Sequence, residues 1–342
     1  MREVEYRFYR VRDGVTLETL QAKGAPTIRF QSGAKVMRSL SGAFKHSSGA
    51  NWFTDRIRAE MTLNGVTSPL GVFAVSTLSE SYSNGVSIDN IEAMDFGLLV
   101  KQVSTEGVLH LSKGAEYIAT IKSLLSECGL ISIYADPSEA TLQTDREDWD
   151  EGTSYLTIVN ALLEELNYNP LWFDAEGNAR LTAYQAPTMT NVRHEYKSGA
   201  DSVILDACTI TQDIYSPYNV FKVIVSNADL TEPMTAVAVN SDPTSKTSTA
   251  QLNRRILAPV TKLDNIASQD ALQAYADKLR DDSQIASEAI TFSTANMPGH
   301  AYLDTIALEH ERLSGIYVET DWSMSLSYSG KMTHKAKRVL YL

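Results

Sequence analysis

The sequence predicts a β-rich α+β protein with two antiparallel β-domains and a small α+β module between them. Three observations support this fold class. Apolar residues alternate with polar ones at the period of two typical of strands, both before residue 112 and again after Pro187. Between Lys113 and Pro187 the period changes to three and four, as in amphipathic helices. Two Asn-Gly pairs separate strand-like runs near the start. We therefore expect domains at 1–112, 113–190 and 191–342.

Residues 1–112 have the pattern of an antiparallel β-barrel or sandwich. Residues 3–11 alternate as a strand, and Asp13-Gly14 then turns the chain. Further strand-like runs follow near 26–30, 36–44, 56–63, 70–78 and 86–96. Asn64-Gly65 and Asn84-Gly85 are expected to form type I′ hairpin turns, because both central residues of that turn need a positive φ. We find no long amphipathic helix before residue 112.

Residues 113–190 predict a compact module of helix, strand, helix and hairpin. The first helix should end at Gly129, and its apolar face comprises Ile118, Ile121, Leu124, Leu125 and Cys128. Leu130 to Tyr134 is expected to be a strand, followed by a polar loop. Thr153 is the expected N-cap of the second helix, which should stop before Pro170. An apolar run at 171–173, a turn at 174–178 and a strand at 179–184 then predict a β-hairpin.

The β pattern returns in residues 191–342. Strands are expected at Val203–Gln212, Asn219–Asn227 and Thr235–Val239, and residues 240–251 have the composition of an exposed, mobile loop. A helix near 268–284 should be capped by Ser268 and loosened at Asp281-Asp282-Ser283. Its inward face comprises Leu272, Tyr275, Ala276 and Leu279. Strands near 286–294, 303–310, 315–327 and 332–341 would complete this second β-domain.

Composition and charge restrict the class of protein. Of the 342 residues, 43% are hydrophobic and 21% charged, which is typical of a globular chain. The first residues lack a secretory signal and no run is long enough to span a membrane, so we expect folding in a cytoplasm. The net charge is −12, with 12 basic and 11 acidic residues in 1–112, 4 and 13 in 113–190, and 14 and 18 in 191–342. Such a balance argues against a protein that grips nucleic-acid phosphates. Cys128 and Cys208 are expected to be buried free thiols.

No residue pattern predicts an active site. Paired carboxylates can serve glycoside hydrolysis or bind a hard cation, but the acidic run between 145 and 151 lacks a calcium-loop pattern and is interpreted as a solvated loop. That run contains Asp145, Glu147, Asp148, Asp150 and Glu151. The histidines are scattered without a metal-binding motif, at positions His46, His110, His194, His300, His310 and His334. Ser154 does not lie in a nucleophile elbow and is interpreted as polarity in the first helical turn. We predict no catalytic, cofactor-binding or metal-binding residues, and no cofactor.

Two further groups of side chains have alternative interpretations. Large aromatic residues are concentrated in the α+β module, where core packing is the favoured interpretation and a protein contact or a sugar-stacking surface the alternative. They are Trp149, Tyr155, Tyr168, Trp172, Phe173 and Tyr184. A basic group near the C-terminus comprises Lys331, His334, Lys335, Lys337 and Arg338. It is interpreted as a strand whose charged face meets water or an acidic neighbour, with a contact to DNA or a wall polymer as the alternative.

Several segments resemble one known family. An acidic Trp-containing loop precedes GTSYL (152–156), and NYNPLWFD (167–174) and AYQAP (183–187) follow. SPLGVFAVST (68–77) and IEAMDF (91–96) lie before these, and PGHAYLDTIAL (298–308) and GKMTHKAKRVLYL (330–342) lie after them. In this order they resemble the hub proteins of bacteriophage tails and related injection machines.

The resemblance implies a structural protein and not an enzyme. Its two β-barrels would be similar to tail-tube subunits duplicated within one chain, and three chains would form a ring that joins a hexameric tail tube to a trimeric spike. The implied partners are the tube protein, the spike protein and baseplate wedge or distal tail proteins, with no specific nucleic acid and no membrane. The implied location is the virion tail of a phage, prophage or tailocin, assembled in the host cytoplasm. The alternatives are a tail-tip peptidoglycan-degrading enzyme, with the 145–151 carboxylates around a cleft, and a host-surface polysaccharide-binding module.

Overall fold

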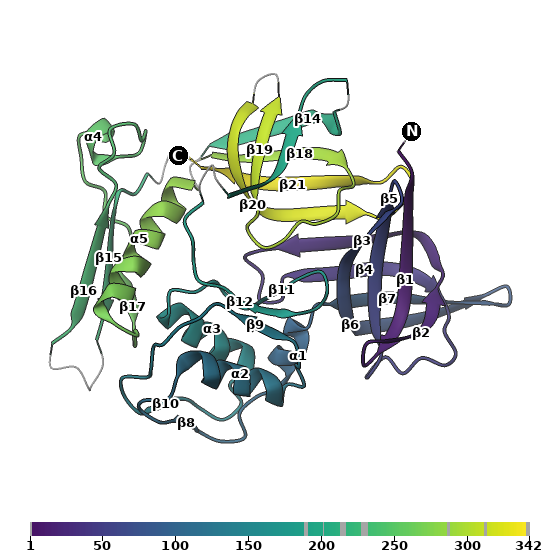
Figure 1. Cartoon of the computed structure of the whole chain (residues 1–342), viewed down its shortest axis with the longest axis horizontal. Helices are drawn as coiled ribbons and strands as arrows, with labels where there is room; N and C mark the ends of the chain where they lie inside the picture. Colours follow the sequence, from purple (N-terminus) through teal and green to yellow (C-terminus); the bar gives the residue numbers. More distant parts are fainter. Residues whose placement is uncertain are drawn as a thin grey trace.

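A computed structural model describes residues 2–187, 191–200, 202–212, 217–226, 232–285, 288–310 and 313–339 (Figure 1). Its elements in chain order are β1 (Val4–Arg12), β2 (Val15–Leu20), β3 (Ala22–Gln31), β4 (Arg38–Lys45), β5 (Arg56–Leu63), β6 (Val66–Ser83), β7 (Val86–Met94), α1 (Gly97–Gln102), β8 (Leu109–Leu111), α2 (Tyr117–Glu127), β9 (Ile133–Ala135), β10 (Arg146–Trp149), α3 (Tyr155–Glu165), β11 (Trp172–Phe173), β12 (Ala179–Leu181), β13 (Val192–Lys197), β14 (Ile204–Gln212), β15 (Val220–Val225), β16 (Met234–Val239), α4 (Thr249–Leu252), β17 (Thr261–Leu263), α5 (Gln269–Ile285), β18 (Glu288–Ala295), β19 (Thr305–His310), β20 (Leu313–Ser325) and β21 (Lys331–Arg338).

The first seven strands form the antiparallel order β3-β4-β7-β6-β5-β1-β2. Both Asn-Gly turns are confirmed, since φ is +50° and +83° at Asn64-Gly65 and +52° and +76° at Asn84-Gly85. The end strands β2 and β3 are separated only by Gln21, so the strands wrap around one core that includes Phe8, Phe44 and Phe73. Among the described residues no ladder between β2 and β3 closes this order into a barrel. The β-rich antiparallel character is therefore confirmed, and barrel closure is not.

The C-terminal strands continue the same sheet. Their order is β14-β18-β21-β20-β19-β13, and β20 also pairs antiparallel with β3, from Asp321 opposite Gln31 to Ser325 opposite Thr27. A single sheet of 13 strands thus contains strands from both ends of the described chain. Trp322 and Met324 of β20 contribute to the same core as Ile28 and Phe30 of β3. Figure 1 shows this junction at the centre of the molecule.

The two strand sets repeat one topology. In the first, β3-β4-β7-β6-β5 are successively antiparallel, and β14-β18-β21-β20-β19 repeat this order and these directions in the second. A sixth strand then pairs with each set, but β1 is antiparallel to β5 whereas β13 is parallel to β19. The sequence shows no short tandem repeat because a pleated sheet requires only an alternating pattern, which many residue choices satisfy.

The α+β module lies beside the large sheet, at the lower edge of Figure 1. Helices α1, α2 and α3 and the small sheet β11-β12-β9 share one core. The predicted hairpin is confirmed as β11 and β12, and Gly129 has the expected positive φ of +80°. The N-cap prediction was wrong, because Ser154 accepts the hydrogen bond from the Thr157 amide while the Thr153 hydroxyl donates to the Asp150 carbonyl. The strand expected at Leu130–Tyr134 is limited to β9.

A second α+β unit lies on the left of Figure 1, where α5 packs on the sheet β16-β15-β17. Ser268 caps α5 as predicted, through its hydroxyl and the Ala271 amide. Residues 281–283 do not loosen the helix, which continues to Ile285. The exposed loop expected at 240–251 was wrong in part, because Asn240, Ser245 and Ser248 are buried and hydrogen-bonded and α4 begins within it, whereas other residues such as Lys246 are exposed. The described part of the chain contains no helix long and apolar enough to cross a membrane. The predicted strand ends at 227 and at 340–341 lie outside the described residues.

Candidate functional site

The structure disperses the acidic run into local contacts. Residues 146–149 form β10, which pairs with β8, so the loop interpretation was wrong for this part. Asp145 accepts a hydrogen bond of 2.7 Å from the Lys113 amide, and the Glu147 carboxylate lies 3.1 Å from His110. Asp148 is paired with Arg146, and Asp150 uses its carbonyl to accept from Thr105. The carboxylates of Asp145, Glu147 and Asp148 are therefore engaged in separate local contacts.

The sequence interpretation missed the cation that organises this run. Arg146 is 5% exposed and donates two hydrogen bonds, of 2.8 and 2.9 Å, to the buried Glu165 of α3. The Tyr117 hydroxyl of α2 donates to the same carboxylate over 2.6 Å. The Arg146 guanidinium also lies 4.9 Å from the ring centroid of Trp149. Such a paired and hydrogen-bonded ion pair fixes β10 against α2 and α3. The one arginine within an acidic run was the available signal.

The aromatic residues of the module are mostly core. Trp149, Tyr168, Trp172 and Phe173 are buried, at 9% exposure or less, which confirms the packing interpretation for these four and removes them from any exposed platform. The other two are partly exposed and hydrogen-bond to acidic side chains, Tyr155 to Glu127 and Tyr184 to Asp282. Trp172 also stacks on Tyr302, at 5.9 Å between ring centroids, and so packs the module against the C-terminal strand set.

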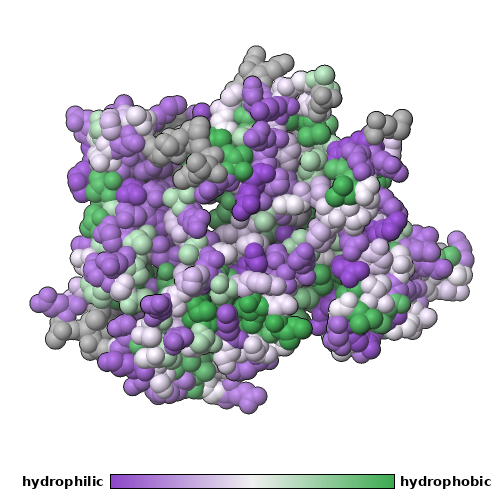
Figure 2. All heavy atoms as spheres, in the orientation of Figure 1, coloured by the Kyte–Doolittle hydropathy of each residue, from purple (hydrophilic) through white to green (hydrophobic). Residues whose placement is uncertain are grey.

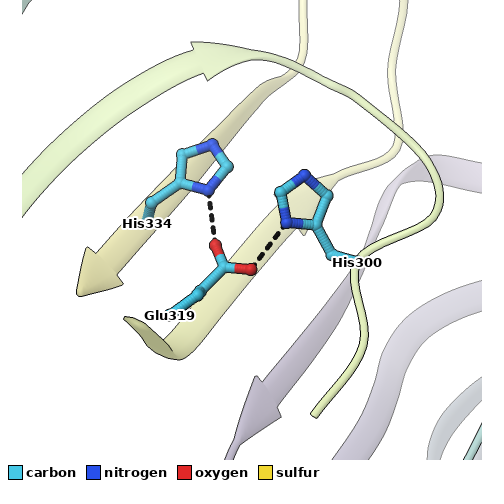
Figure 3. A group of neighbouring side chains, drawn as sticks. All are labelled: His300, Glu319 and His334. Atoms are coloured by element: carbon cyan, nitrogen blue, oxygen red, sulfur yellow. Dashed lines mark hydrogen bonds and ion pairs between the residues drawn. The ribbon is translucent and has the colours of Figure 1, made fainter. Parts of the chain in front are cut away.

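Three of the six scattered histidines are brought together in the C-terminal strand set. Glu319 of β20 is fully buried, and its two carboxylate oxygens lie 2.6 Å from Nδ1 of His300 and 2.6 Å from Nδ1 of His334 (Figure 3). His194 of β13 stacks on His300, with ring centroids 3.8 Å apart. The sequence could not reveal this cluster, because its members are contributed by three strands and a loop that only the sheet topology brings together.

The outer ring nitrogens of the cluster also have partners. The Tyr196 hydroxyl lies 2.8 Å from Nε2 of His300, and the Thr294 hydroxyl lies 2.8 Å from Nε2 of His334. Burial lowers the pKa of His300 to about 3 and also lowers the pKa of His334, while it raises the pKa of Glu319. Both imidazoles can therefore remain neutral and donate from Nδ1 to the carboxylate. The arrangement is a closed hydrogen-bond network that connects β20, β21 and the loop before β19.

Two groups in the described residues have the donor atoms that a metal ion needs. The first is the cluster of His300, Glu319 and His334, whose nitrogens and oxygens are already engaged with one another. The second is His46 with Glu80 and Asp89, where the His46 imidazole lies 2.8 Å from Asp89 and this contact raises its pKa. In the first group both Nδ1 atoms and both carboxylate oxygens are used in hydrogen bonds to one another, and in the second the Asp89 carboxylate also accepts a hydrogen bond from the Ser47 amide.

The remaining sequence candidates are dispersed. His334 points into the core, whereas Lys331 and Lys335 of the same strand are exposed, and Arg338 pairs with Glu288 over 3.0 Å. The interpretation of a strand with its charged face in water or against an acidic neighbour therefore agrees with these contacts. Cys128 and Cys208 are free thiols, as expected, but they are only partly buried, which corrects the expected burial. Burial raises the pKa of Cys128 to about 11.

A cleft of about 1050 Å³ lies between the α+β module and the C-terminal strands. Its lining is mixed and includes Trp172, Arg180, His194, Tyr302 and Asp304. Asp304 accepts hydrogen bonds from the Ala301 amide and faces His194 at 3.1 Å, so its carboxylate is already used to hold the loop. Figure 2 shows hydrophilic residues over most of the visible face, with hydrophobic ones in small separate groups. Among the described residues no nucleophile, base and orienting group converge in this cleft.

The chain matches no protein-family model and no curated protein by sequence. Solved structures are similar to it over almost its whole length. A tail protein from Neisseria meningitidis MC58 aligns with a TM-score of 0.66 and 11% identity, over 97% of this chain and 96% of that one. The 43 kDa tail protein of prophage MuSo2 from Shewanella oneidensis aligns with 0.65 and 10%, over 99% of both chains. Prophage tail protein gp18 from Listeria monocytogenes aligns with 0.58 and 13%, over 97% and 94%.

These likenesses define the fold. From its first strand to its last, this chain has the fold of bacteriophage and prophage tail proteins, as the resemblance of its sequence segments implied. A component of the Escherichia coli type VI secretion system, described as structurally similar to the tail proteins gp27 and gp5 of phage T4, also aligns with it, at a TM-score of 0.50 and 10% identity over 99% of this chain and 78% of that one.

Proposed function

We propose that this protein is the structural hub of a phage or phage-like tail tip, where three copies form a ring that joins the hexameric tail tube to a trimeric spike. The main support for the proposal is that the structural alignments with three tail proteins include at least 94% of this chain and at least 94% of each tail protein. The whole chain is thus used by the tail-protein fold, and no part of the described chain is left over for a separate catalytic domain.

The repeated topology supports the joining role. A chain that carries two similar strand sets presents two similar surfaces per copy, so three copies present six, which fits a sixfold tube on one side and a threefold spike on the other. Each strand set would close into a tube-like barrel within that ring. The implied partners are the tube protein, the spike protein and neighbouring baseplate proteins. The type VI secretion component and a VgrG-containing complex among the similar structures support a spike neighbour.

The two alternatives have less support. A peptidoglycan-degrading enzyme would need the carboxylates of 145–151 to face each other across a cleft, but Asp145, Glu147 and Asp148 are engaged in separate contacts. A polysaccharide-binding platform would need exposed aromatic rings, but four of the six rings of the module are buried.

Deletion of the coding sequence from its phage or prophage tests the proposal. We expect particles or tubes without an attached spike, and restoration of complete tails when the wild-type chain is supplied in trans. Complete, spike-bearing tails in the deletion strain would refute the hub role. A matched control is complementation with Val237→Lys, a change at an exposed position of β16, outside the large sheet.

A further inference from the structure

The two strand sets can be matched residue by residue through their bulges. The β6–β7 ladder is irregular between Val75 and Thr77, and the β20–β21 ladder is irregular between Glu319 and Asp321. When Ser76 is matched with Thr320, the pair Thr77–Glu92 of the first ladder corresponds to Asp321–Lys335 of the second. Bulges mark fixed places in a ladder, so this match sets the register of the whole repeat.

The segment after the bulge is paired on both sides in only one of the two sets. In β20 this segment also pairs with β3, and Trp322, Met324 and Leu326 are 4%, 1% and 3% exposed. In β6 the equivalent segment, Thr77–Ser83, pairs with β7 only, and among the described strands nothing lies along its other side. Leu78 and Tyr82, which correspond to Trp322 and Leu326, are 44% and 74% exposed. We call Thr77–Ser83 the outer segment of β6.

The strand that corresponds to β3 is β14, and among the described strands it too is paired on one side only. Thr27 of β3 lies opposite Ser41 of β4, and Ser41 lies opposite Glu92 of β7. In the same way, Thr209 of β14 lies opposite Thr291 of β18, and Thr291 lies opposite Lys335 of β21. Since Glu92 and Lys335 are matched, Thr27 and Thr209 are matched too. Both strands are irregular just before this point, at Lys23–Thr27 and at Leu205–Cys208. The match makes Ile210 the counterpart of Ile28. Ile28 is fully buried by the contact with β20, whereas Ile210 is 47% exposed.

We propose that the outer segment of β6 in one copy pairs antiparallel with β14 of a second copy, in the register of the internal β20–β3 contact. Leu78 would lie opposite Gln212, Ser79 opposite Thr211, Glu80 opposite Ile210 and Ser81 opposite Thr209. Each copy supplies one edge of each kind, so the contact is head-to-tail and propagates in one direction. Closure after three copies rests on the proposed function, whereas the pairing itself rests on the repeat.

A second copy fits these edges better than an unrelated strand. An exposed sheet edge is a template for another strand, and here the chain already contains the matching template in its own β20–β3 junction. Leu78, Tyr82 and Ile210 are exposed at positions whose counterparts Trp322, Leu326 and Ile28 are buried. The polar Glu80 and Gln212 occupy the positions of Met324 and Phe30. Pairing would therefore cover apolar side chains and unpaired backbone groups together.

The register can be tested by a disulfide. In the internal junction the Leu326 amide donates to the Pro26 carbonyl and the Ser32 amide donates to the Thr320 carbonyl, which makes Ser323–Arg29 a non-hydrogen-bonded pair. Ser79–Thr211 is its equivalent across the proposed contact. Side chains of such pairs are close enough for a disulfide, since their Cβ atoms lie about 4.5–5.5 Å apart and a small shift brings them within bonding range.

The experiment uses the full chain with Cys128→Ser and Cys208→Ser, to which Ser79→Cys and Thr211→Cys are added. Mild oxidation of the purified chain and of assembled tail tips should give intermolecular disulfides, in species up to the closed ring on a non-reducing gel. The matched control is Ser79→Cys with Thr209→Cys, which is two residues out of register and should cross-link at least several-fold less. Equal cross-linking of the two pairs, or no cross-link of the first pair in assembled tips, would overturn the inference.

Two surface variants provide an independent measurement. Leu78→Lys and Ile210→Lys each place a charge at an exposed position, so the chain should fold normally but associate with its own copies at least tenfold more weakly, as measured by sedimentation or by recovery in tail tips. Val237→Lys, a change at an equally exposed 44%, should leave association unchanged. If the chain is present in tail tips but these variants and the cross-link behave as the controls do, the edge pairing is wrong and the hub role stands. If the chain is absent from tails, the hub role itself is wrong.

Discussion

Replacement of Glu319 by Leu tests whether the buried histidine cluster holds the C-terminal strands together. The substitution removes the carboxylate that His300 and His334 share, and leaves two buried Nδ1–H groups without that acceptor. Each stranded donor costs roughly 1–3 kcal/mol, so the free energy of opening this region should fall by about 2–6 kcal/mol. The loss should appear in β20 and β21, which the cluster joins.

Hydrogen exchange of the β20 and β21 amides is the suitable assay, because it reports the local opening free energy of one part of a large chain. Glu309→Leu, at an exposed position of β19, is the matched control and should change stability by no more than about 0.5 kcal/mol. The double variant Glu319→Leu/His334→Leu should lose less opening free energy than the sum of the losses of the two single variants, because the donor is removed together with its acceptor. A Glu319→Leu effect as small as that of the control would refute the cluster's structural role.

Three other predictions concern the remaining sites. Arg146→Met should destabilise the α+β module by about 3–5 kcal/mol, because it leaves the buried Glu165 carboxylate without its cation, while the exposed Lys122→Met should have little effect in the same denaturation experiment. The pKa of His300 is lowered from its ordinary value of 6.5 to about 3. Between these two pH values the unfolded chain binds more protons than the folded one, so the free energy of unfolding should fall as the pH drops below about 6.5. His300→Phe should show a weaker fall when unfolding is measured as a function of pH. Purified protein should release no sugar or peptide from cell walls, and product formation that disappears on changing Asp148 to Ala would favour the enzyme alternative.

Much of the local structure could be predicted because it depends on neighbouring residues. Asn64-Gly65 and Asn84-Gly85 specify their turns through φ alone, and Gly129 ends its helix for the same reason. The hairpin of β11 and β12 and the inward face of α5 followed from side-chain periodicity. The errors arose where several local solutions compete, as between Thr153 and Ser154 for the N-cap.

Long-range features were not predictable from one sequence. The polar residues of 240–251 have the composition of a mobile loop, yet the Asn240 amide donates to Ser245 and places both in the interior. The histidine cluster requires strand pairing that brings residues 300, 319 and 334 to one point. The junction of β3 with β20 joins residues nearly 300 positions apart, and no periodicity encodes such a partner. The prediction of the function depended on the resemblance of scattered sequence segments to tail hub proteins, and the similarity of the fold to tail proteins then supported that resemblance.

Imaging of the native tail tip by electron cryomicroscopy tests the central claim most directly. The hub role predicts three copies of this chain in one ring between tube and spike, with the outer segment of β6 in each copy beside β14 of the next. A chain found elsewhere in the particle, or present in a number that does not match a threefold ring, would contradict it.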